Sequence, residues 1–240
     1  MSEIEKLQEL INESNNIVFF GGAGVSTESG IKDFRGKDGL YKKQDNDFDF
    51  PPEYMLSNEC LINNPSVFFK YYKNNMNCLE AKPNITHKYL KKLEDKKKLK
   101  AVITQNIDGL HQKAGSKNVL ELHGTINKNY CMECLKEYPA TYIFNSTGIP
   151  KCECGGIIRP QVVLYGEALP EAFSLAYSYI LNADLLIVGG TSLTVEPASS
   201  LVRMFNGKSL VIINSDKTPY DDIATLTIHK PLGEVFSKLI

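Results

Sequence analysis

One stretch near the start of the chain decides the fold: Ile17-Val18-Phe19-Phe20-Gly21-Gly22-Ala23-Gly24-Val25-Ser26-Thr27. Its four apolar residues predict a strand that is buried on both faces. Glycines at positions 22 and 24 would let the main chain approach a ligand and present amide groups to a pyrophosphate. Thr27 stands where a full dinucleotide-binding fingerprint has its third glycine, so the match is partial. A plain glycine turn between a strand and a helix explains this segment about equally well.

Short apolar strands alternate with helices along the rest of the chain. Further strands are predicted at residues 101–104, 119–122, 185–188, 210–213 and 225–228. Helices are predicted at residues 2–14, 65–79, 86–98, 170–182 and 197–206, and from Pro231 onward. Residues 31–60 are aromatic and rich in turn formers, which predicts a long loop of the kind that is usually functional. This alternation predicts an α/β fold: a Rossmann-like open parallel sheet with helices on both faces.

Length and charge exclude several classes of protein. The chain has 240 residues, with 27 basic and 28 acidic side chains. That balance does not favour a general nucleic-acid binder, which would carry excess positive charge. No stretch approaches the roughly 20 apolar residues of a membrane span, and the polar first residues do not form a signal peptide. We therefore expect a cytoplasmic protein that binds neither nucleic acid nor membrane.

Four cysteines gather in a segment that interrupts the α/β alternation. They are Cys131, Cys134, Cys152 and Cys154. Two thiolate pairs separated by a hairpin-length insert suit a closed tetrahedral zinc site, so residues 126–158 are predicted to form a small inserted zinc ribbon. Two disulfides or scattered core thiols are the alternatives. The Cys152-x-Cys154 pair is one residue tighter than the usual spacing, which leaves its local geometry open.

Glycine or small polar residues follow five of the predicted strands. Besides the glycine turn at 21–27, these are the segments 105–108, 123–124, 189–192 and 214–216. Because ligands bind beyond the carboxyl ends of strands in open α/β sheets, these ends predict a polar, phosphate-sized crevice. His123 ends a strand opposite Asn106 and Asp108. A neutral imidazole there could take a proton from a sugar hydroxyl, whereas a lone histidine is more often structural.

Together these segments resemble the sirtuins, the family of NAD-dependent protein-lysine deacylases. The motifs appear in the family's order over nearly the whole chain: Gly22-Ala23-Gly24-Val25-Ser26, Gly30-Ile31-Lys32-Asp33-Phe34-Arg35, Thr104-Gln105-Asn106-Ile107-Asp108, His123-Gly124, the four cysteines, Gly190-Thr191-Ser192-Leu193 and Asn214. The resemblance implies a single catalytic domain over residues 1–240. Its large lobe would comprise about 1–30, 84–125 and 159–240, and its small lobe about 31–83 and 126–158.

The resemblance also implies roles for individual residues. NAD would be bound by Gly22, Ala23, Gly24, Ser26, Thr27, Asp33, Phe34, Arg35, Gln105, Asn106, Ile107, Asp108, His123, Gly190, Thr191, Ser192, Asn214 and Ser215. The catalytic residues would be His123, Asn106 and Asp108. The acyl-lysine would be held by Val162, Leu164, Tyr165, Gly166 and Glu167, with Val162, Leu164 and Tyr165 forming an apolar tunnel and a peptide adding a strand there. One structural zinc would sit on the four cysteines.

The implied reaction consumes NAD as a co-substrate. The acyl oxygen attacks the ribose as nicotinamide leaves, and His123 then acts as general base on a ribose hydroxyl. The products would be free lysine, O-acetyl-ADP-ribose and nicotinamide, which is also expected to inhibit. A mono-ADP-ribosyltransferase and a long-chain deacylase are the alternatives. Members that prefer acidic acyl groups carry a tyrosine and an arginine after the first loop, but residues 39–51 contain only Lys42 and Lys43 as basic residues, so a neutral acyl group is expected.

Overall fold

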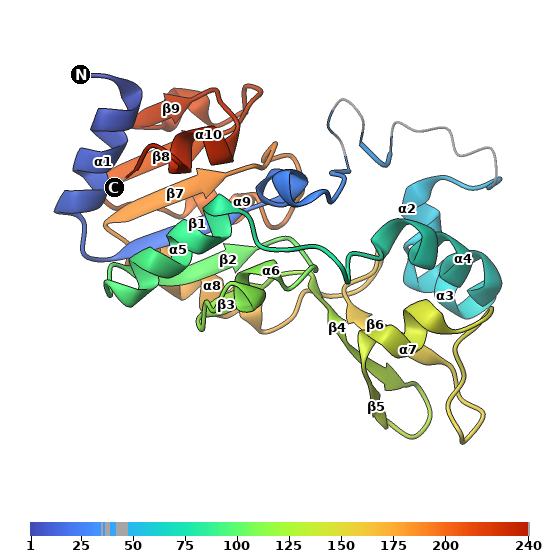
Figure 1. The fold of residues 1–240 in the computed structure, drawn as a ribbon. Helices are drawn as coiled ribbons and strands as arrows, with labels where there is room; N and C mark the ends of the chain where they lie inside the picture. Colours follow the sequence, from blue (N-terminus) through green and yellow to red (C-terminus); the bar gives the residue numbers. More distant parts are fainter. Residues whose placement is uncertain (35, 37–38, 42–47, 240) are drawn as a thin grey trace.

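The chain folds into two regions of different build (Figure 1). A computed structural model describes residues 1–34, 36, 39–41 and 48–239. We call the region around the six-stranded sheet the large lobe; it contains both termini. We call the region around the three-stranded sheet and helices α2, α3, α4 and α7 the small lobe. The residue boundaries inferred from the sequence for two such units stay a prediction.

The large lobe is built on a parallel sheet with strand order β3-β2-β1-β7-β8-β9. Its strands are β1 Ile17–Gly21, β2 Leu99–Thr104, β3 Val119–Glu121, β7 Leu185–Gly189, β8 Ser209–Ile213 and β9 Leu226–Ile228. Strand β1 lies between β2 and β7, so the chain order reverses at β1. The loops after β1 and β7 therefore diverge at a topological switch point, where open α/β sheets bind ligands. The predicted Rossmann-like open sheet is confirmed.

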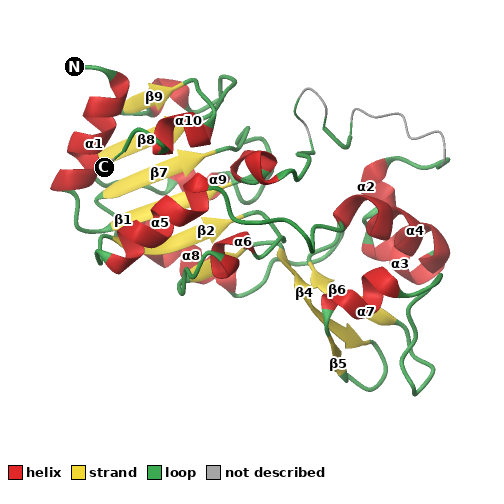
Figure 2. Cartoon of the chain, viewed as in Figure 1, coloured by secondary structure: helices red, strands yellow, loops and turns green. Residues whose placement is uncertain are grey.

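Both faces of this sheet are covered, which explains its uninterrupted apolar strands (Figure 2). Ile17 and Phe19 of β1 pack in one core and Val18 and Phe20 in the other, because side chains alternate along a strand. The first core is covered by α1 Glu3–Glu13, α5 Ile85–Asp95 and α10 Leu232–Phe236. The second is covered by α8 Ala172–Leu181 and α9 Ser200–Arg203. Ser2 caps α1, with its hydroxyl oxygen accepting the Glu5 amide (3.3 Å).

The small lobe has an antiparallel sheet and a core rich in aromatic residues. Its strands are β4 Gly124–Cys131, β5 Glu137–Tyr138 and β6 Ile158–Val162, in the order β5-β4-β6. Its helices are α2 Pro52–Met55, α3 Asn58–Asn63, α4 Pro65–Met76 and α7 Ala140–Asn145. The ring of Tyr72 stacks between those of Phe68 and Phe144, each with a centroid separation of 5.6 Å. These stacked rings pack α4 against α7.

Three segments differ from the sequence prediction. The expected loop at 31–60 contains helices α2 and α3, because Pro52 starts the first and Ser57 caps the second through the Cys60 amide (3.0 Å). The helix expected at 197–206 is helical only in α9, since its flanks form tight turns with bonds to the third residue back. A short helix, α6 Leu110–Lys113, was not predicted. Among the described residues, no helix has the length and apolar character to cross a membrane.

Candidate NAD and acyl-lysine site with a metal centre

The glycine loops after β1 and β7 contact each other directly. The amide of Gly22 donates to the Gly189 carbonyl (3.2 Å) and that of Gly24 to the Gly190 carbonyl (2.8 Å). A Cβ atom on Gly24 would lie 2.8 Å from the Gly190 Cα, and one on Gly190, where φ is +61°, would lie 2.5 Å from the Val25 nitrogen. The sequence predicts that Gly22 and Gly24 allow close approach to a ligand. The structure gives another reason, which is that two main chains pack here without room for side chains.

A hydrogen-bonded cluster links the first glycine loop to the segment after β2. The buried Ser26 hydroxyl donates to Asp108 Oδ2 (2.7 Å) and accepts a bond from Asn106 Nδ2 (3.1 Å). Asp108 Oδ1 accepts a further bond from the Leu110 amide (2.8 Å). Burial raises the pKa of Asp108, although these hydrogen bonds oppose the rise. The cluster therefore fixes a carboxylate in a low-dielectric site at the carboxyl edge of the sheet.

The segments after β2, β3 and β7 meet through Gln105. Its side-chain nitrogen Nε2 donates to Thr191 Oγ1 (3.2 Å), and its carbonyl lies 2.9 Å from His123 Nδ1. Because a carbonyl oxygen can only accept, Nδ1 must carry the proton in this bond. In the neutral imidazole of His123 the lone pair then lies on Nε2. The half-buried ring is thus oriented and set in the tautomer that a general base requires.

The segment after the first glycine loop turns sharply around Asp33. Asp33 Oδ1 accepts the Gly36 amide (2.9 Å), and Thr27 Oγ1 donates to the Gly24 carbonyl (3.1 Å). The ring of Phe34 packs edge-on against Tyr41 at 5.3 Å between centroids. Ala23 begins a 3-10 turn (Ala23–Val25). The structure does not describe Arg35, a predicted NAD contact, or Lys42 and Lys43, the basic residues used to predict the acyl preference.

The remaining NAD-binding candidates lie farther along the sheet edge or toward the small lobe. The exposed Ser192 hydroxyl pairs with Thr194 Oγ1 (2.8 Å). After β8, Asn214 Nδ2 donates to the Asp216 carbonyl (2.8 Å), and Ser215 is exposed. Ile107 packs against the small-lobe core, and its carbonyl accepts the Ile126 amide (3.0 Å). Ile107 therefore lies where the two lobes join, as does Phe34, which packs against the same core.

The predicted acyl-lysine segment presents a different face from the one expected. Val162 and Leu164 are buried in the small-lobe core, whereas Val163 is half-buried and Tyr165 is exposed. Side chains alternate along an extended chain, so Val163 and Tyr165 lie on the outward side. The predicted tunnel of Val162, Leu164 and Tyr165 therefore has only Tyr165 on that side, and its role in binding acyl-lysine stays a prediction. The Tyr165 hydroxyl lies 2.7 Å from that of Tyr41.

Much of this segment's main chain is already hydrogen-bonded within the protein. The Val163 amide donates to the His123 carbonyl (2.9 Å), and the Tyr165 amide donates to the Leu56 carbonyl (3.1 Å). Gly166 has a φ of +88°. Glu167 accepts two bonds from Arg159 and one from the Leu164 amide, so its carboxylate is occupied by the protein itself. Burial opposes ionisation of Glu167, but these bonds outweigh it and lower its pKa.

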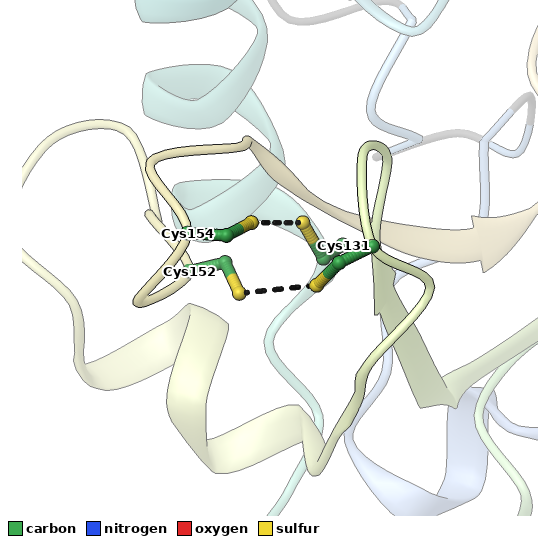
Figure 3. Close-up of side chains that lie close together, drawn as sticks. Cys131, Cys152 and Cys154 are labelled. Atoms are coloured by element: carbon green, nitrogen blue, oxygen red, sulfur yellow. Dashed lines mark hydrogen bonds between the residues drawn. The ribbon is translucent and has the colours of Figure 1, made fainter.

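The four predicted metal ligands converge between β4 and the turn before β6 (Figure 3). Their sulfur atoms all lie within 4.8 Å of one another, with Cys131 and Cys154 at 3.4 Å and Cys134 and Cys152 at 3.6 Å. A zinc tetrahedron with bonds of about 2.3 Å has edges of about 3.8 Å, so the set fits zinc. The separations exceed the roughly 2.05 Å of a disulfide, which argues against that alternative.

The tight Cys152-x-Cys154 spacing is accommodated by a local turn. Gly155 has a φ of +90°, and its amide donates to the Cys152 carbonyl (2.9 Å). The Tyr138 hydroxyl donates to Cys152 Sγ (3.0 Å), and this bond leads the interactions that lower the pKa of Cys152 to about 6. A thiolate, the state that binds metal, is therefore favoured at Cys152, whereas at Cys154 the main-chain hydrogen bond of Gly156 is outweighed by bonds to the other three cysteines, which raise its pKa.

Comparison with known proteins identifies the family. Residues 22–197 match the Sir2 family, and the chain belongs to it. It is 51% identical over 243 residues to an NAD-dependent protein deacetylase of Clostridium acetobutylicum, covering 100% of this chain and 99% of the relative.

Solved structures of Sir2 have the same fold as this chain. One of Sir2 with a deacetylated p53 peptide and 3'-O-acetyl ADP-ribose has a TM-score of 0.90 at 40% identity, covering 98% of this chain and 96% of the other. Another, of Sir2 with a p53 peptide and NAD+, has a TM-score of 0.85 at 40% identity, covering 99% and 97%.

Proposed function

We propose that this chain is an NAD-dependent protein-lysine deacetylase. It transfers the acyl group of a modified lysine to the ADP-ribose part of NAD, consumes one water molecule, and releases nicotinamide, free lysine and O-acetyl-ADP-ribose. The names of its relatives and the ligands of the similar Sir2 structures support this activity. NAD is the co-substrate, and nicotinamide is a product and an inhibitor. Acyl-lysine proteins or peptides are the partners.

One observation carries the proposal most directly: the tautomer of His123, set by the Gln105 carbonyl beside the Ser26–Asn106–Asp108 cluster. NAD supplies the ribose that receives the acyl group. Nε2 of His123 takes the proton from a ribose hydroxyl, which becomes the nucleophile toward the acyl carbon. Asp108 holds the nicotinamide carboxamide by accepting its N–H groups, and Asn106 orients the groups around the ribose. The glycine loops and Thr191 bind the phosphates.

The acyl-lysine would enter between the two lobes along Val163 and Tyr165. Both lie on the exposed side of the segment that leads away from His123, and the Val163 amide bonds to the His123 carbonyl. The main chain of the substrate peptide would lie against Gly166, which has no side chain to block it. Zinc, held by the four cysteines, would stabilise the small lobe and take no part in the chemistry, since a site with four thiolate ligands has no open position.

The test uses purified protein, NAD and an acetyl-lysine peptide, with products followed by mass spectrometry. Stoichiometric nicotinamide, deacetylated peptide and O-acetyl-ADP-ribose are expected, and none without NAD. His123→Ala should reduce turnover by about 10²-fold or more, with zinc content and melting temperature unchanged. Deacetylation that proceeds equally without NAD, or survives His123→Ala, would show that the proposal is wrong.

The same assay separates the alternatives. A mono-ADP-ribosyltransferase would leave an ADP-ribose adduct on protein and produce no O-acetyl-ADP-ribose. A panel of acetyl, longer aliphatic and succinyl peptides tests the acyl preference, for which residues 39–51, lacking arginine, favour a neutral group. We also propose a cytoplasmic location, since a reducing compartment keeps four thiols available for metal.

A further inference from the structure

We propose that Arg159 and Glu167 are positioning residues that hold the acyl-lysine segment, residues 162–167, in the shape that receives the substrate lysine. The inference rests on the proposed function. Neither side chain is offered as a group that touches the reacting atoms. They act through the turn between them, which separates the buried Leu164 from the exposed Tyr165.

Arg159 and Glu167 form a bidentate ion pair, in which each carboxylate oxygen accepts one hydrogen bond from the guanidinium. Arg159 donates from Nη1 and Nη2 to the two carboxylate oxygens of Glu167, at 2.6 and 3.1 Å. Two further donors, from Nε and Nη2, reach the carbonyls of Pro160 (3.2 Å) and Val162 (3.1 Å). Arg159 is only 9% exposed. A planar guanidinium matched to a carboxylate in this way fixes both partners, which a lysine could not do.

Glu167 in turn closes the turn of the acyl-lysine segment. Its carboxylate accepts the Leu164 amide (2.9 Å), and its own amide donates to the Leu164 carbonyl (3.0 Å). Gly166, at a φ of +88°, provides the reversal. Leu164 is thus held from both sides in the small-lobe core, and Tyr165 is left on the outer face. The Tyr165 carbonyl accepts the Asn58 amide (3.0 Å), and the Tyr165 amide donates to the Leu56 carbonyl (3.1 Å). The main chain of this substrate-facing residue is therefore hydrogen-bonded on both sides.

Arg159 also connects this turn to the sheet that carries the metal ligands. It lies on β6 opposite Tyr130 of β4, and its guanidinium stands 5.9 Å from the centre of the Tyr130 ring. The next residue on β4 is Cys131. The substrate segment is therefore built on the same rigid sheet as the zinc site, and its shape depends on a charge pair that neither NAD nor zinc would contact.

The experiment compares Glu167→Gln and Arg159→Lys with Glu234→Gln. The last variant removes the exposed ion pairs that Glu234 of α10, in the large lobe, makes with Lys238 (3.0 Å) and Lys230 (3.6 Å), and it is the matched control. Initial rates are measured against acetyl-lysine peptide and against NAD. Binding of a fluorescent acetyl-lysine peptide is measured by anisotropy. For Glu167→Gln we expect the KM for peptide and the peptide Kd to rise about 10-fold, with kcat and the KM for NAD within about 2-fold. Arg159→Lys should show a smaller rise of the same kind, and Glu234→Gln none.

Two results would overturn the proposal: a peptide KM and Kd that stay within about 2-fold of the unmodified chain, or equal rises in KM for peptide and NAD, which indicate general damage. If Glu167→Gln loses its zinc, Arg159→Lys, which keeps the buried positive charge, decides by the same criteria. If the unmodified chain binds the acetyl peptide but releases no nicotinamide, the proposed function fails, while the anisotropy measurements still decide the positioning role.

Discussion

The two lobes reach a defined structure by different physical means. In the large lobe all residues of β1, β7 and β8 are buried, and helices cover both faces of the sheet. In the small lobe β4 mixes buried, half-buried and exposed positions, and four thiols converge at its end. The large lobe is therefore stabilised by apolar burial on both faces of its sheet, whereas the small lobe combines an aromatic core with four thiols placed to bind a structural zinc. The catalytic candidates lie at the join, since His123 directly precedes β4.

Removal of the metal should break the small lobe and spare the large one. Structural zinc contributes on the order of 10–16 kcal/mol to folding in small domains. We expect Cys131→Ser to lose zinc, to lose at least about 10²-fold in deacetylation because the substrate segment shares that sheet, and to exchange amides rapidly at 126–158 only. Hydrogen exchange and metal analysis check this.

Cys78→Ser is the matched control, because burial raises the pKa of that thiol to about 12 and it lies outside the cluster. Protection of residues 126–158 in the zinc-free variant would contradict the comparison between the lobes.

Two glycines with nearly the same positive φ should separate the cost of packing from the cost of that φ. Gly190 and Gly148 have φ values of +61° and +63°, but only Gly190 is crowded, and nothing lies within 4 Å of a Cβ on Gly148. Gly148→Ala in the small lobe should cost about 1 kcal/mol of unfolding free energy. Gly190→Ala adds an overlap with the first glycine loop and should cost about 3 kcal/mol. Equal costs in urea unfolding would show that the loops do not need this contact.

Acid should destabilise the large lobe through two buried histidines. Burial lowers the pKa of His87 to about 4 and that of His111 to about 3, and their rings lie 4.7 Å apart. Both histidines take up protons near pH 6.5 in the unfolded chain but not in the folded chain. Their contribution to the free energy of unfolding is therefore complete above that pH. It is lost as pH falls toward 4, by up to about 1.4 kcal/mol per pH unit for each histidine.

Unfolding free energies measured between pH 7 and 5 check this, with His87→Gln as the comparison. His87→Gln should lower the slope of unfolding free energy against pH by up to about 1.4 kcal/mol per pH unit, the contribution of one titrating histidine. An unchanged slope would mean that His87 is not held neutral in the folded chain.

The smallest effect is expected at the hydroxyl pair that joins Tyr41 to Tyr165. The pair is 2.7 Å long but lies at the surface. Tyr165→Phe should change stability by less than about 0.5 kcal/mol and the peptide KM by less than about 2-fold. Tyr165→Ala should raise the peptide KM about 10-fold if the ring lines the substrate path. A large effect of Tyr165→Phe would instead assign the binding role to the hydroxyl.

The large lobe was the more predictable of the two. Its strands were found because they are short apolar runs that end in glycine or polar residues, and the polar ends of β1, β2, β3 and β7 meet as expected. The helices α2 and α3 were missed, since their stability comes from burying Met55 and Leu61 in the small-lobe core and not from a long local pattern. The family was recognised from the motifs and is confirmed, whereas the assignment of NAD contacts stays a prediction.

The sequence by itself determined the class of sheet, the four thiols and the set of residues at the strand ends, because these depend on patterns only a few residues long. Tertiary structure decided which side of residues 162–165 faces outward, which nitrogen of His123 holds the lone pair, and why the glycines at 24 and 190 are needed. Each of these depends on a partner from a distant segment: β4 for Val162, the Gln105 carbonyl for His123, and one glycine loop for the other. Local periodicity does not encode such contacts, which exist only once the strands have paired.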